Sequence, residues 1–284
     1  MYLSHYNLLK KPFQLTTDPD FLWLGEKHKE AYATLKYAIT ENKGVLVLTG
    51  DVGTGKTTLI NALIKSLEED IVAATIYDPS LEVLEFFNVV ATALKMGKTF
   101  ESKGKFIAHF RQLLQKAHER KQKVLLIIDE AQSLSKELLE NIRLLSNIEL
   151  PNEKLINIFF VGQDELNRTL ASQECRALRQ RIVLTYNIKP LSAIEIFAYI
   201  KYRLKIAGTD IKLFNRKAIK EVYRFSSGYP RLINTICDHA LLTGYVRKLN
   251  KITPAIIIEC SYELNLSGEI KKSTFSNFLE QPYT

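Results

Sequence analysis

The amino-acid sequence predicts an α/β fold, in which a parallel five-stranded sheet with helices on both faces is followed by a small all-helical domain. Short apolar runs alternate with segments whose apolar residues recur at helical spacing, and this alternation indicates a parallel sheet. A glycine-rich turn joins the first apolar run to the first amphipathic segment. After Pro190 only the helical period continues, which separates a second domain from the first.

The first half of the sheet domain follows from its apolar runs. GVLVLTG at 44–50 predicts a doubly buried strand, and the segment 56–67 has the apolar spacing of a helix. IVAATIYDP at 71–79 predicts a second strand that is ended by proline. Two helical patterns follow, at about 81–95 and 103–120, and the polar stretch between them predicts a loop.

The third apolar run, KVLLIIDEAQSL, begins as a buried strand with Asp129 and Glu130 at its carboxyl end. Ser135 is suited to cap a helix that runs through Ile148, because its hydroxyl can accept a hydrogen bond from the first turn. The acidic pair therefore lies between a strand end and a helix start.

The second half of the sheet domain contains two further strands. LINIFFVGQ at 155–163 predicts a fourth strand that ends in Gln163, and a helical stretch covers 164–181. IVLTYNIKPL predicts a fifth strand that is ended by Pro190. Parallel sheets bind ligands at the carboxyl ends of their strands, so the polar residues at these ends are candidates for a site.

Composition divides the rest of the chain and limits its function. We expect a sheet domain at 41–190, a helical domain at 191–265 with four helices (192–207, 215–226, 230–247 and 254–265), and a flexible tail at 266–284. The chain has a net charge of +8, and residues 191–265 hold 12 Lys or Arg against 6 Asp or Glu, a net +6. Such a basic region attracts nucleic acid, anionic lipid or an acidic protein, or is simply a solvated helical surface.

The cysteines and the apolar runs exclude several other classes. Cys175, Cys237 and Cys260 are scattered, so the sequence indicates neither a zinc site nor a disulfide framework. The N-terminus lacks the apolar core of a signal peptide, and there is no run of roughly 18 apolar residues for a transmembrane helix. We expect a cytoplasmic protein whose cysteines are buried and reduced.

The turn GDVGTGKT, from Gly50 to Thr57, matches the phosphate-binding pattern G-x-x-x-x-G-K-[ST]. Glycines let backbone N–H groups surround a β-phosphate, and the helix N-terminus attracts its charge. Lys56 is expected to contact the β- and γ-phosphates, Thr57 to bind Mg²⁺, and Thr58 to contact the α-phosphate. The alternative is a chance glycine turn, but a strand precedes it and a helix follows. The expected nucleotide contacts are Gly50, Asp51, Val52, Gly53, Thr54, Gly55, Lys56, Thr57 and Thr58.

The acidic pair and Gln163 supply the second half of a hydrolytic site. Asp129 is expected to hold Mg²⁺ together with Thr57, and Glu130 to act as the general base that polarises the attacking water. The alternative for the pair is acidic capping of a helix N-terminus. Gln163 is expected to contact the γ-phosphate and the water, with a turn-forming polar residue as the alternative.

Four arginines are candidates for the transition-state charge. CRALRQRI carries Arg176, Arg179 and Arg181 just before the fifth strand, where one of them can enter a neighbouring subunit's site. Arg181 is the first choice and Arg179 the second, and the alternative is a solvated basic face. Arg231, at the start of a helix in the helical domain, is expected to contact the γ-phosphate and couple hydrolysis to domain rotation. A surface arginine is the alternative there.

The order of these motifs resembles AAA+ ATPases. The opening block YNLLKKPFQLTTDPDFLWLGEKHKEAYATLKYAI and the block GYPRLINTICDHALLTGY are similar to the ATPase domain of the general secretion pathway protein A family, and this resemblance covers residues 2–265. Related ATPases serve type IV pilus, including MSHA pilus, and exopolysaccharide or exosortase loci, and transposition ATPases are more distant.

The resemblance implies roles for individual residues and two bound groups, ATP and Mg²⁺. Lys56 and Thr57 correspond to the phosphate and metal contacts, Asp129 and Glu130 to the metal and water contacts. Gln163 resembles the family's first sensor and Arg231 its second. The segment 1–40 is expected to pack on the ATPase core and line the adenine pocket, with Phe13, Leu24 and His28 as candidates; structural packing is the alternative.

The resemblance also implies a function, which is Mg-dependent ATP hydrolysis by a homo-oligomer that drives conformational work in a secretion, pilus or polysaccharide-export assembly. The family's proteins continue into a membrane segment and a peptidoglycan-binding region, whereas this sequence ends near the helical domain. We therefore expect action on a separate protein partner at the inner membrane. The alternatives are a DNA-binding ATPase of the transposition type, a nucleotide-gated scaffold with little turnover, and a small-molecule kinase. Glu130 argues against a scaffold, which needs no general base.

Overall fold

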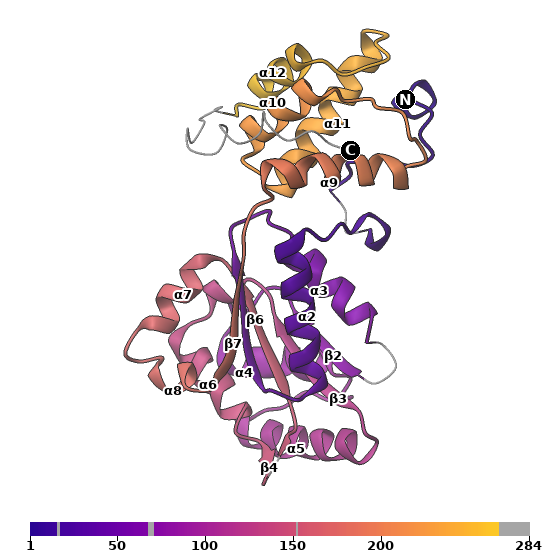
Figure 1. Ribbon diagram of the computed structural model, residues 1–284. Helices are drawn as coiled ribbons and strands as arrows, with labels where there is room; N and C mark the ends of the chain where they lie inside the picture. The colour runs from indigo at the N-terminus through magenta and orange to yellow at the C-terminus, as the bar shows by residue number, and fades with distance from the viewer. Residues whose placement is uncertain (16–17, 68–70, 152, 267–284) are drawn as a thin grey trace. The chain divides into compact units, whose positions relative to one another are not determined.

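A computed structural model describes residues 1–15, 18–67, 71–151 and 153–266 of the chain. The chain divides into two compact units (Figure 1). Leu24–Lys189 form the first, which we call the sheet unit. Met1–Trp23 and the chain from Pro190 onward form the second, which we call the helical unit. Each unit is described by itself below.

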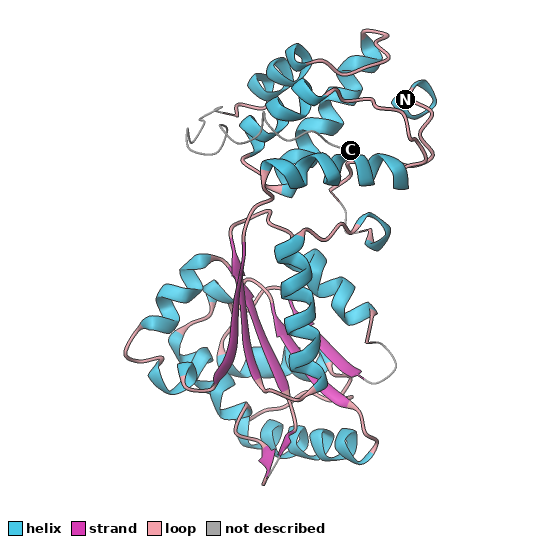
Figure 2. Ribbon diagram, in the orientation of Figure 1, coloured by secondary structure: helices cyan, strands magenta, loops and turns pink. Residues whose placement is uncertain are grey.

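The sheet unit contains one five-stranded sheet, in the order β2-β3-β6-β1-β7, in which every neighbouring pair is parallel (Figure 2). The expected α/β fold with a parallel five-stranded sheet is therefore confirmed. The strands, in chain order, are β1 Val45–Gly50, β2 Ile71–Ile76, β3 Lys123–Ile128, β6 Asn157–Gly162 and β7 Ile182–Ile188.

Burial explains why the apolar runs form these strands. All six residues of β1 and of β6 are buried, as expected for central strands that are covered on both faces. The edge strands β2 and β7 are only partly buried. Successive side chains of β1 alternate between two apolar cores, since Val45 and Val47 enter one and Leu46 and Leu48 enter the other.

Helices cover both faces of this sheet (Figure 1). Apolar residues of α2 and α3 pack on one face, and those of α4, α5, α6 and α7 pack on the other. The described helices of the unit are α2 Glu26–Thr40, α3 Lys56–Lys65, α4 Val83–Ala93, α5 Lys103–Glu119, α6 Lys136–Leu145, α7 Asp164–Ala171 and α8 Arg176–Arg179, and the 3₁₀ turn η2 lies at Ala131–Ser133.

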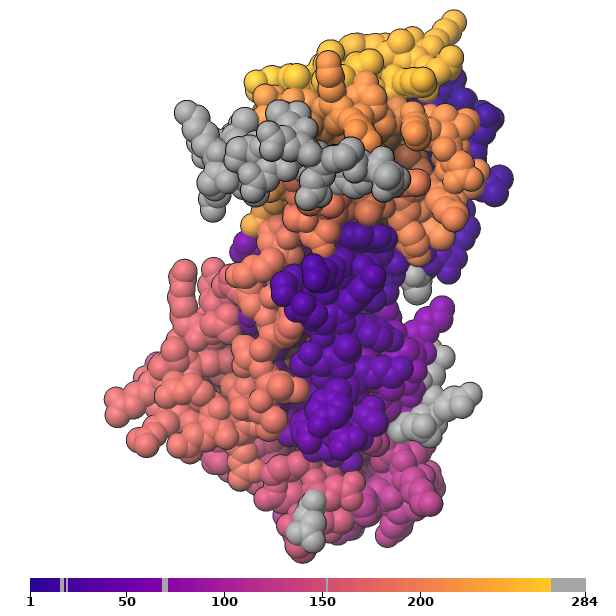
Figure 3. All heavy atoms as spheres, viewed as in Figure 1, coloured from indigo at the N-terminus to yellow at the C-terminus, as the bar shows by residue number. Residues whose placement is uncertain are grey.

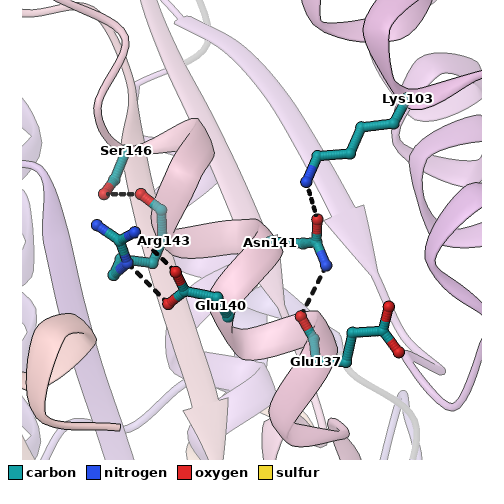
Figure 4. A network of polar contacts seen from close by, with 6 residues as sticks. All are labelled: Lys103, Glu137, Glu140, Asn141, Arg143 and Ser146. Atoms are coloured by element: carbon teal, nitrogen blue, oxygen red, sulfur yellow. Dashed lines mark hydrogen bonds and ion pairs between the residues drawn. The ribbon is translucent and has the colours of Figure 1, made fainter. Parts of the chain in front are cut away.

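Polar side chains fix the position of α6. Ser135 caps this helix, as expected, by accepting a hydrogen bond from the Leu138 N–H at 3.1 Å. In Figure 4 the Asn141 side chain bridges two elements, because its amide donates to the Glu137 carbonyl at 2.8 Å while its oxygen accepts from Lys103 of α5. These contacts hold α6, the helix that follows Glu130 in the chain, against α5.

Two local features differ from the expectation. The helix expected at 164–181 is interrupted, since α7 ends at Ala171 and Ser172 has an extended backbone. A short antiparallel pair, β4 Glu149–Leu150 and β5 Glu153–Lys154, lies before β6. Each strand has two residues, which is too short to show an alternating apolar pattern.

The helical unit contains the four helices that were expected after Pro190. They are α9 Ala193–Ile206, α10 Arg216–Ser226, α11 Pro230–Val246 and α12 Pro254–Glu263, and the N-terminal part adds α1 Tyr2–His5 and the 3₁₀ turn η1 Pro19–Phe21. Their apolar faces form one core. Cys175, Cys237 and Cys260 are all free and buried, as expected.

The N-terminal segment Met1–Trp23 belongs to the helical unit, whereas the segment 1–40 was expected to pack as a whole on the sheet domain. Four aromatic residues explain this, because the side chains of Tyr2, Tyr6, Phe13 and Phe21 are buried in the core of the helical unit. The indigo atoms at the N-terminus lie beside the orange and yellow helices in Figure 3. Only the part from Leu24 onward lies in the sheet unit.

Two further expectations concern the tail and the membrane. The tail expected at 266–284 lies, beyond Leu266, outside the described residues. Across the described ranges up to residue 266, none of the helices combines the length and the apolar character that crossing a membrane requires.

Candidate active site

The glycine-rich turn leaves β1 at Gly50 and enters α3 at Lys56. Gly50 lies so close to β7 that a Cβ there would be 2.5 Å from the Ile188 carbonyl oxygen. Gly53 and Gly55 have φ angles of +80° and +98°, a left-handed conformation that favours glycine. The first N–H groups of α3 lack intrahelical partners, so the loop and the helix start form a cradle for an anion.

Lys56 lies inside this cradle and is only 8% exposed. Its ammonium donates hydrogen bonds to the Gly50 carbonyl at 2.8 Å and to the Asp51 carbonyl at 3.0 Å. Burial lowers the pKa of Lys56 below its ordinary value, and the carboxylates of Glu130, Asp129 and Asp51 oppose this shift. These carboxylates favour the charged ammonium, which is the form that pairs with phosphate.

Thr57 and Asp129 meet beside the cradle. The Thr57 hydroxyl donates to the Asp129 carboxylate at 2.9 Å, and Asp129 follows β3 with 7% of its surface exposed. A hydroxyl and a carboxylate are hard oxygen ligands of the type that Mg²⁺ prefers. The residues present thus fit the metal that the motif implies.

Glu130 follows Asp129 and has a left-handed backbone, with a φ angle of +51°. One oxygen of its carboxylate accepts hydrogen bonds from the side-chain amides of Gln132 at 2.6 Å and Gln163 at 3.4 Å. Gln132 also accepts a hydrogen bond from the Gln163 backbone N–H at 3.0 Å. The ends of β3 and β6 are therefore linked through three polar side chains.

Residues that the sequence analysis did not single out form hydrogen bonds at the end of β1, directly before the glycine-rich turn. The buried Thr49 hydroxyl accepts hydrogen bonds from the amides of Asn167 and Asn187, both at 3.0 Å. The Asn187 amide also donates to Asp164 at 2.6 Å. His28, which the sequence placed among the adenine-pocket candidates, donates to the Thr54 carbonyl of the loop at 3.0 Å.

The other two adenine-pocket candidates, Phe13 and Leu24, belong to different units. Phe13 is 1% exposed in the core of the helical unit, where its ring packs edge-on against Phe214 with centroids 5.8 Å apart. Leu24 begins the sheet unit and packs partly buried against the core that α2 and α3 cover. The structure therefore gives Phe13 a packing role.

The three arginines before β7 lie near the amino ends of the strands, whereas the glycine-rich turn lies at their carboxyl ends. Since β1 and β7 are parallel with Gly50 beside Ile188, the start of β7 lies roughly 20 Å from the turn, at about 3.3 Å per residue. Arg179 donates to the Leu170 carbonyl at 2.9 Å, and Arg181 pairs with Glu149 at 3.7 Å. Arg176 is exposed. At this distance none of them can serve the site of its own chain.

Arg231 belongs to the helical unit, as the second residue of α11 after Pro230. It is exposed, and its side chain makes no hydrogen bond or ion pair with any residue that the structure describes. Within that part of the chain it is thus an unpaired cation near a helix N-terminus, where a positive charge is unfavourable unless an anion binds.

Comparison with known proteins gives the following similarities. The family described as AAA domain matches residues 39–170. Over 267 residues the chain is 35% identical to general secretion pathway protein A of Aeromonas hydrophila, an alignment that covers 93% of this chain and 49% of the relative. The chain therefore spans about half the length of that relative.

Solved structures resemble the fold at low identity. The ORC2 protein of Aeropyrum pernix, in ADPNP and ADP complexes, superposes with a TM-score of 0.69 at 15% identity, covering 92% of this chain and 73% of that one. The RuvB Holliday junction branch migration motor of Thermotoga maritima gives 0.57 at 18% identity, covering 87% and 72%.

Proposed function

Because this chain is an AAA ATPase related to general secretion pathway protein A, we propose that it hydrolyses Mg-ATP as a homo-oligomer. The energy would drive conformational work in a secretion, pilus or polysaccharide-export assembly. The observation that carries the proposal is the meeting of Lys56, Thr57 and Asp129 at one edge of the sheet, with Thr57 and Asp129 2.9 Å apart.

The glycine-rich turn binds the nucleotide in this proposal. Backbone N–H groups from Asp51 to Thr58 donate to the phosphate oxygens, and the three glycines give the loop the curvature that this requires. The Lys56 ammonium exchanges the carbonyls of Gly50 and Asp51 for the β- and γ-phosphates. Thr57 and Asp129 would hold Mg²⁺, which when bound neutralises charge on the phosphate oxygens.

Glu130 acts as the general base. Its carboxylate takes a proton from the attacking water while the water oxygen bonds to the γ-phosphorus, and the bond from that phosphorus to the bridging oxygen breaks to leave ADP and phosphate. Gln163, within 3.4 Å of the same carboxylate, orients the water and the γ-phosphate. Such a general base contributes roughly 10²–10⁴-fold to the rate.

A neighbouring subunit completes the site. Arg181 or Arg179 enters the neighbour's site and stabilises the charge of the transition state, since neither reaches the site of its own chain. Arg231 contacts the γ-phosphate and couples hydrolysis to rotation of the helical unit. We place the ATPase in the cytoplasm, at the inner membrane through a protein partner.

A second candidate function is a DNA-dependent ATPase. The observation that favours it is the net charge of +6 over residues 191–265, where 12 basic residues face 6 acidic ones. Basic residues that contact DNA phosphates release counterions, so such binding weakens steeply with salt.

The test is the steady-state ATPase rate across a series of protein concentrations, with and without duplex DNA, at two salt concentrations. A specific activity that rises with protein concentration and ignores DNA supports the oligomeric ATPase with a protein partner. A rate that DNA stimulates and salt abolishes favours the second candidate. No hydrolysis at any concentration, together with tight ATP binding, would leave the nucleotide-gated scaffold.

A further inference from the structure

Gln132 occupies a position between the two strand ends that frame the site. We propose that it is a positioning residue, whose side-chain amide holds the Glu130 carboxylate in one orientation and ties it to the end of β6. This inference rests on the proposed ATP hydrolysis, in which Glu130 is the base. Gln132 is the second residue of η2, and its side chain is half-buried.

Both ends of the Gln132 amide are used. Its nitrogen donates to the Glu130 carboxylate at 2.6 Å, and its oxygen accepts from the Gln163 backbone N–H at 3.0 Å. An amide whose nitrogen and oxygen are both hydrogen-bonded is held in one orientation, so a movement of one partner also moves the other. Any displacement of the end of β6 therefore reaches the carboxylate of Glu130.

The backbone around Gln132 is shaped for this bridge. Glu130 has the left-handed φ angle of +51°, and its carbonyl accepts hydrogen bonds from both the N–H and the hydroxyl of Ser133, at 2.9 and 2.7 Å. Gly162, the last residue of β6, leaves room for the amide. A Cβ at residue 162 would be 2.8 Å from the Gln132 side-chain oxygen and 3.3 Å from its backbone nitrogen.

The bridge also divides the two carboxylate oxygens of Glu130 between two tasks. The oxygen Oε2 accepts from Gln132 and, at 3.4 Å, from Gln163. The other oxygen, Oε1, accepts no hydrogen bond from the residues that the structure describes, so it is the one left for the proton of the attacking water. An exposed carboxylate without this restraint would sample several rotamers, and few of them would face the water.

The experiment compares kcat and KM for Mg-ATP in the full chain and in Gln132→Met, which keeps the length of the side chain and loses the amide. We expect kcat to fall about 10- to 100-fold, since a displacement of about 1 Å at a reacting group costs up to 10²-fold. KM and the Kd for ATP should stay within about threefold, because Gln132 contacts the base and not the loop. Gln115→Met, on the exposed surface of α5, is the matched control and should leave both constants unchanged.

Two double variants separate positioning from a general structural effect. In the Glu130→Gln background, Gln132→Met should lower kcat no further, because there is no base left to orient. Gly162→Ala alone should lower kcat by displacing the amide. Its effect on kcat should become much smaller in the Gln132→Ala background, where the contact at 2.8 Å is gone and only the two contacts at 3.3 Å, to the backbone nitrogen of residue 132 and to Leu166, remain. If the fold-changes in kcat of the two substitutions multiply in full in either double variant, the proposed bridge from Glu130 through Gln132 to Gln163 is wrong.

The outcomes distinguish this inference from the proposed function. If the wild type hydrolyses ATP, Glu130→Gln loses that activity, and Gln132→Met keeps kcat within twofold of the wild type, then Gln132 does not position Glu130. If instead the wild type does not hydrolyse ATP, the proposed function itself is refuted. If Glu130→Gln retains full activity, Glu130 is not the base, and the positioning role of Gln132 is refuted with it. Thermal melting of each variant checks that it folds.

Discussion

Gly50→Ala tests whether the close approach of the glycine-rich turn to β7 shapes the phosphate cradle. The added Cβ would lie 2.5 Å from the Ile188 carbonyl oxygen, 3.1 Å from the Thr54 hydroxyl oxygen and 3.4 Å from the Ile188 carbonyl carbon. Real Cβ contacts essentially never fall below 3.0 Å, so the loop and the strand must move apart until that limit is met. The nearest atom is backbone, which cannot rotate away as a side chain does.

From these contact distances we expect Gly50→Ala to change two quantities, the melting temperature and the Kd for ATP. Forcing an extra methyl group into a packed site costs about 1–3 kcal/mol, which lowers the melting temperature by roughly 2–12 °C in a unit of this size. Displacing the start of the loop also misaligns N–H groups with the phosphates. Losing one hydrogen bond to a charged group costs about 1.5–3 kcal/mol, so the Kd for ATP should rise about 10- to 150-fold.

The assay measures thermal melting and nucleotide affinity for three glycine variants side by side. Gly104→Ala meets no atom within 4 Å and has no positive φ, so it should be neutral or stabilising by about 0.5–1 kcal/mol. Gly97→Ala also meets no atom, but its φ of +73° makes it destabilising by about 1–2 kcal/mol. Neither should change the Kd. An unchanged Kd for ATP in Gly50→Ala would refute the cradle.

Four further predictions follow from the site. Lys56→Ala should abolish ATP binding or hydrolysis, and normal hydrolysis in this variant would exclude the phosphate site. Glu130→Gln should still bind ATP but turn over roughly 10²–10⁴-fold more slowly, and an unchanged rate would remove Glu130 from the mechanism. Arg181→Ala or Arg179→Ala should lower the rate about 10³-fold and abolish its rise with protein concentration; if both are silent, no trans arginine comes from this pair. Chelation by EDTA should stop hydrolysis and added Mg²⁺ restore it, whereas activity in excess chelator would contradict the metal.

The sequence was sufficient to predict the fold class because the central strands are largely apolar runs that end in a glycine or are followed by a polar residue. Burial on both faces produces this signal in β1, β3 and β6. This apolar signal is absent from β4 and β5, because a strand of two residues is too short to show a pattern. The break at Ser172 was also missed, because Leu166, Leu170 and Leu178 are all buried and their spacing resembles one helix.

For the site, the spacing of the motifs located the edge of the sheet but not its hydrogen bonds. The resemblance to general secretion pathway protein A is confirmed by the comparison, while the role of each residue stays a prediction. Gln132 was overlooked although it lies close behind Glu130 in the chain, because only the three-dimensional approach of η2 to β6 gives it a partner. Thr49 was overlooked for the same reason, since its partners are 118 and 138 residues away.

The division of the helical unit between the two ends of the chain has a consequence for biosynthesis. The sheet unit, Leu24–Lys189, is inserted as a whole within the sequence of the other unit. At about 5–20 residues per second, a ribosome needs roughly ten to thirty seconds to traverse it. During that interval the segment Met1–Trp23, with its four buried aromatic side chains, has no partner from its own unit, while the sheet unit can already fold. The order of synthesis thus allows the sheet unit to fold before the helical unit, whose N-terminal segment is made first but must wait for the rest of its unit.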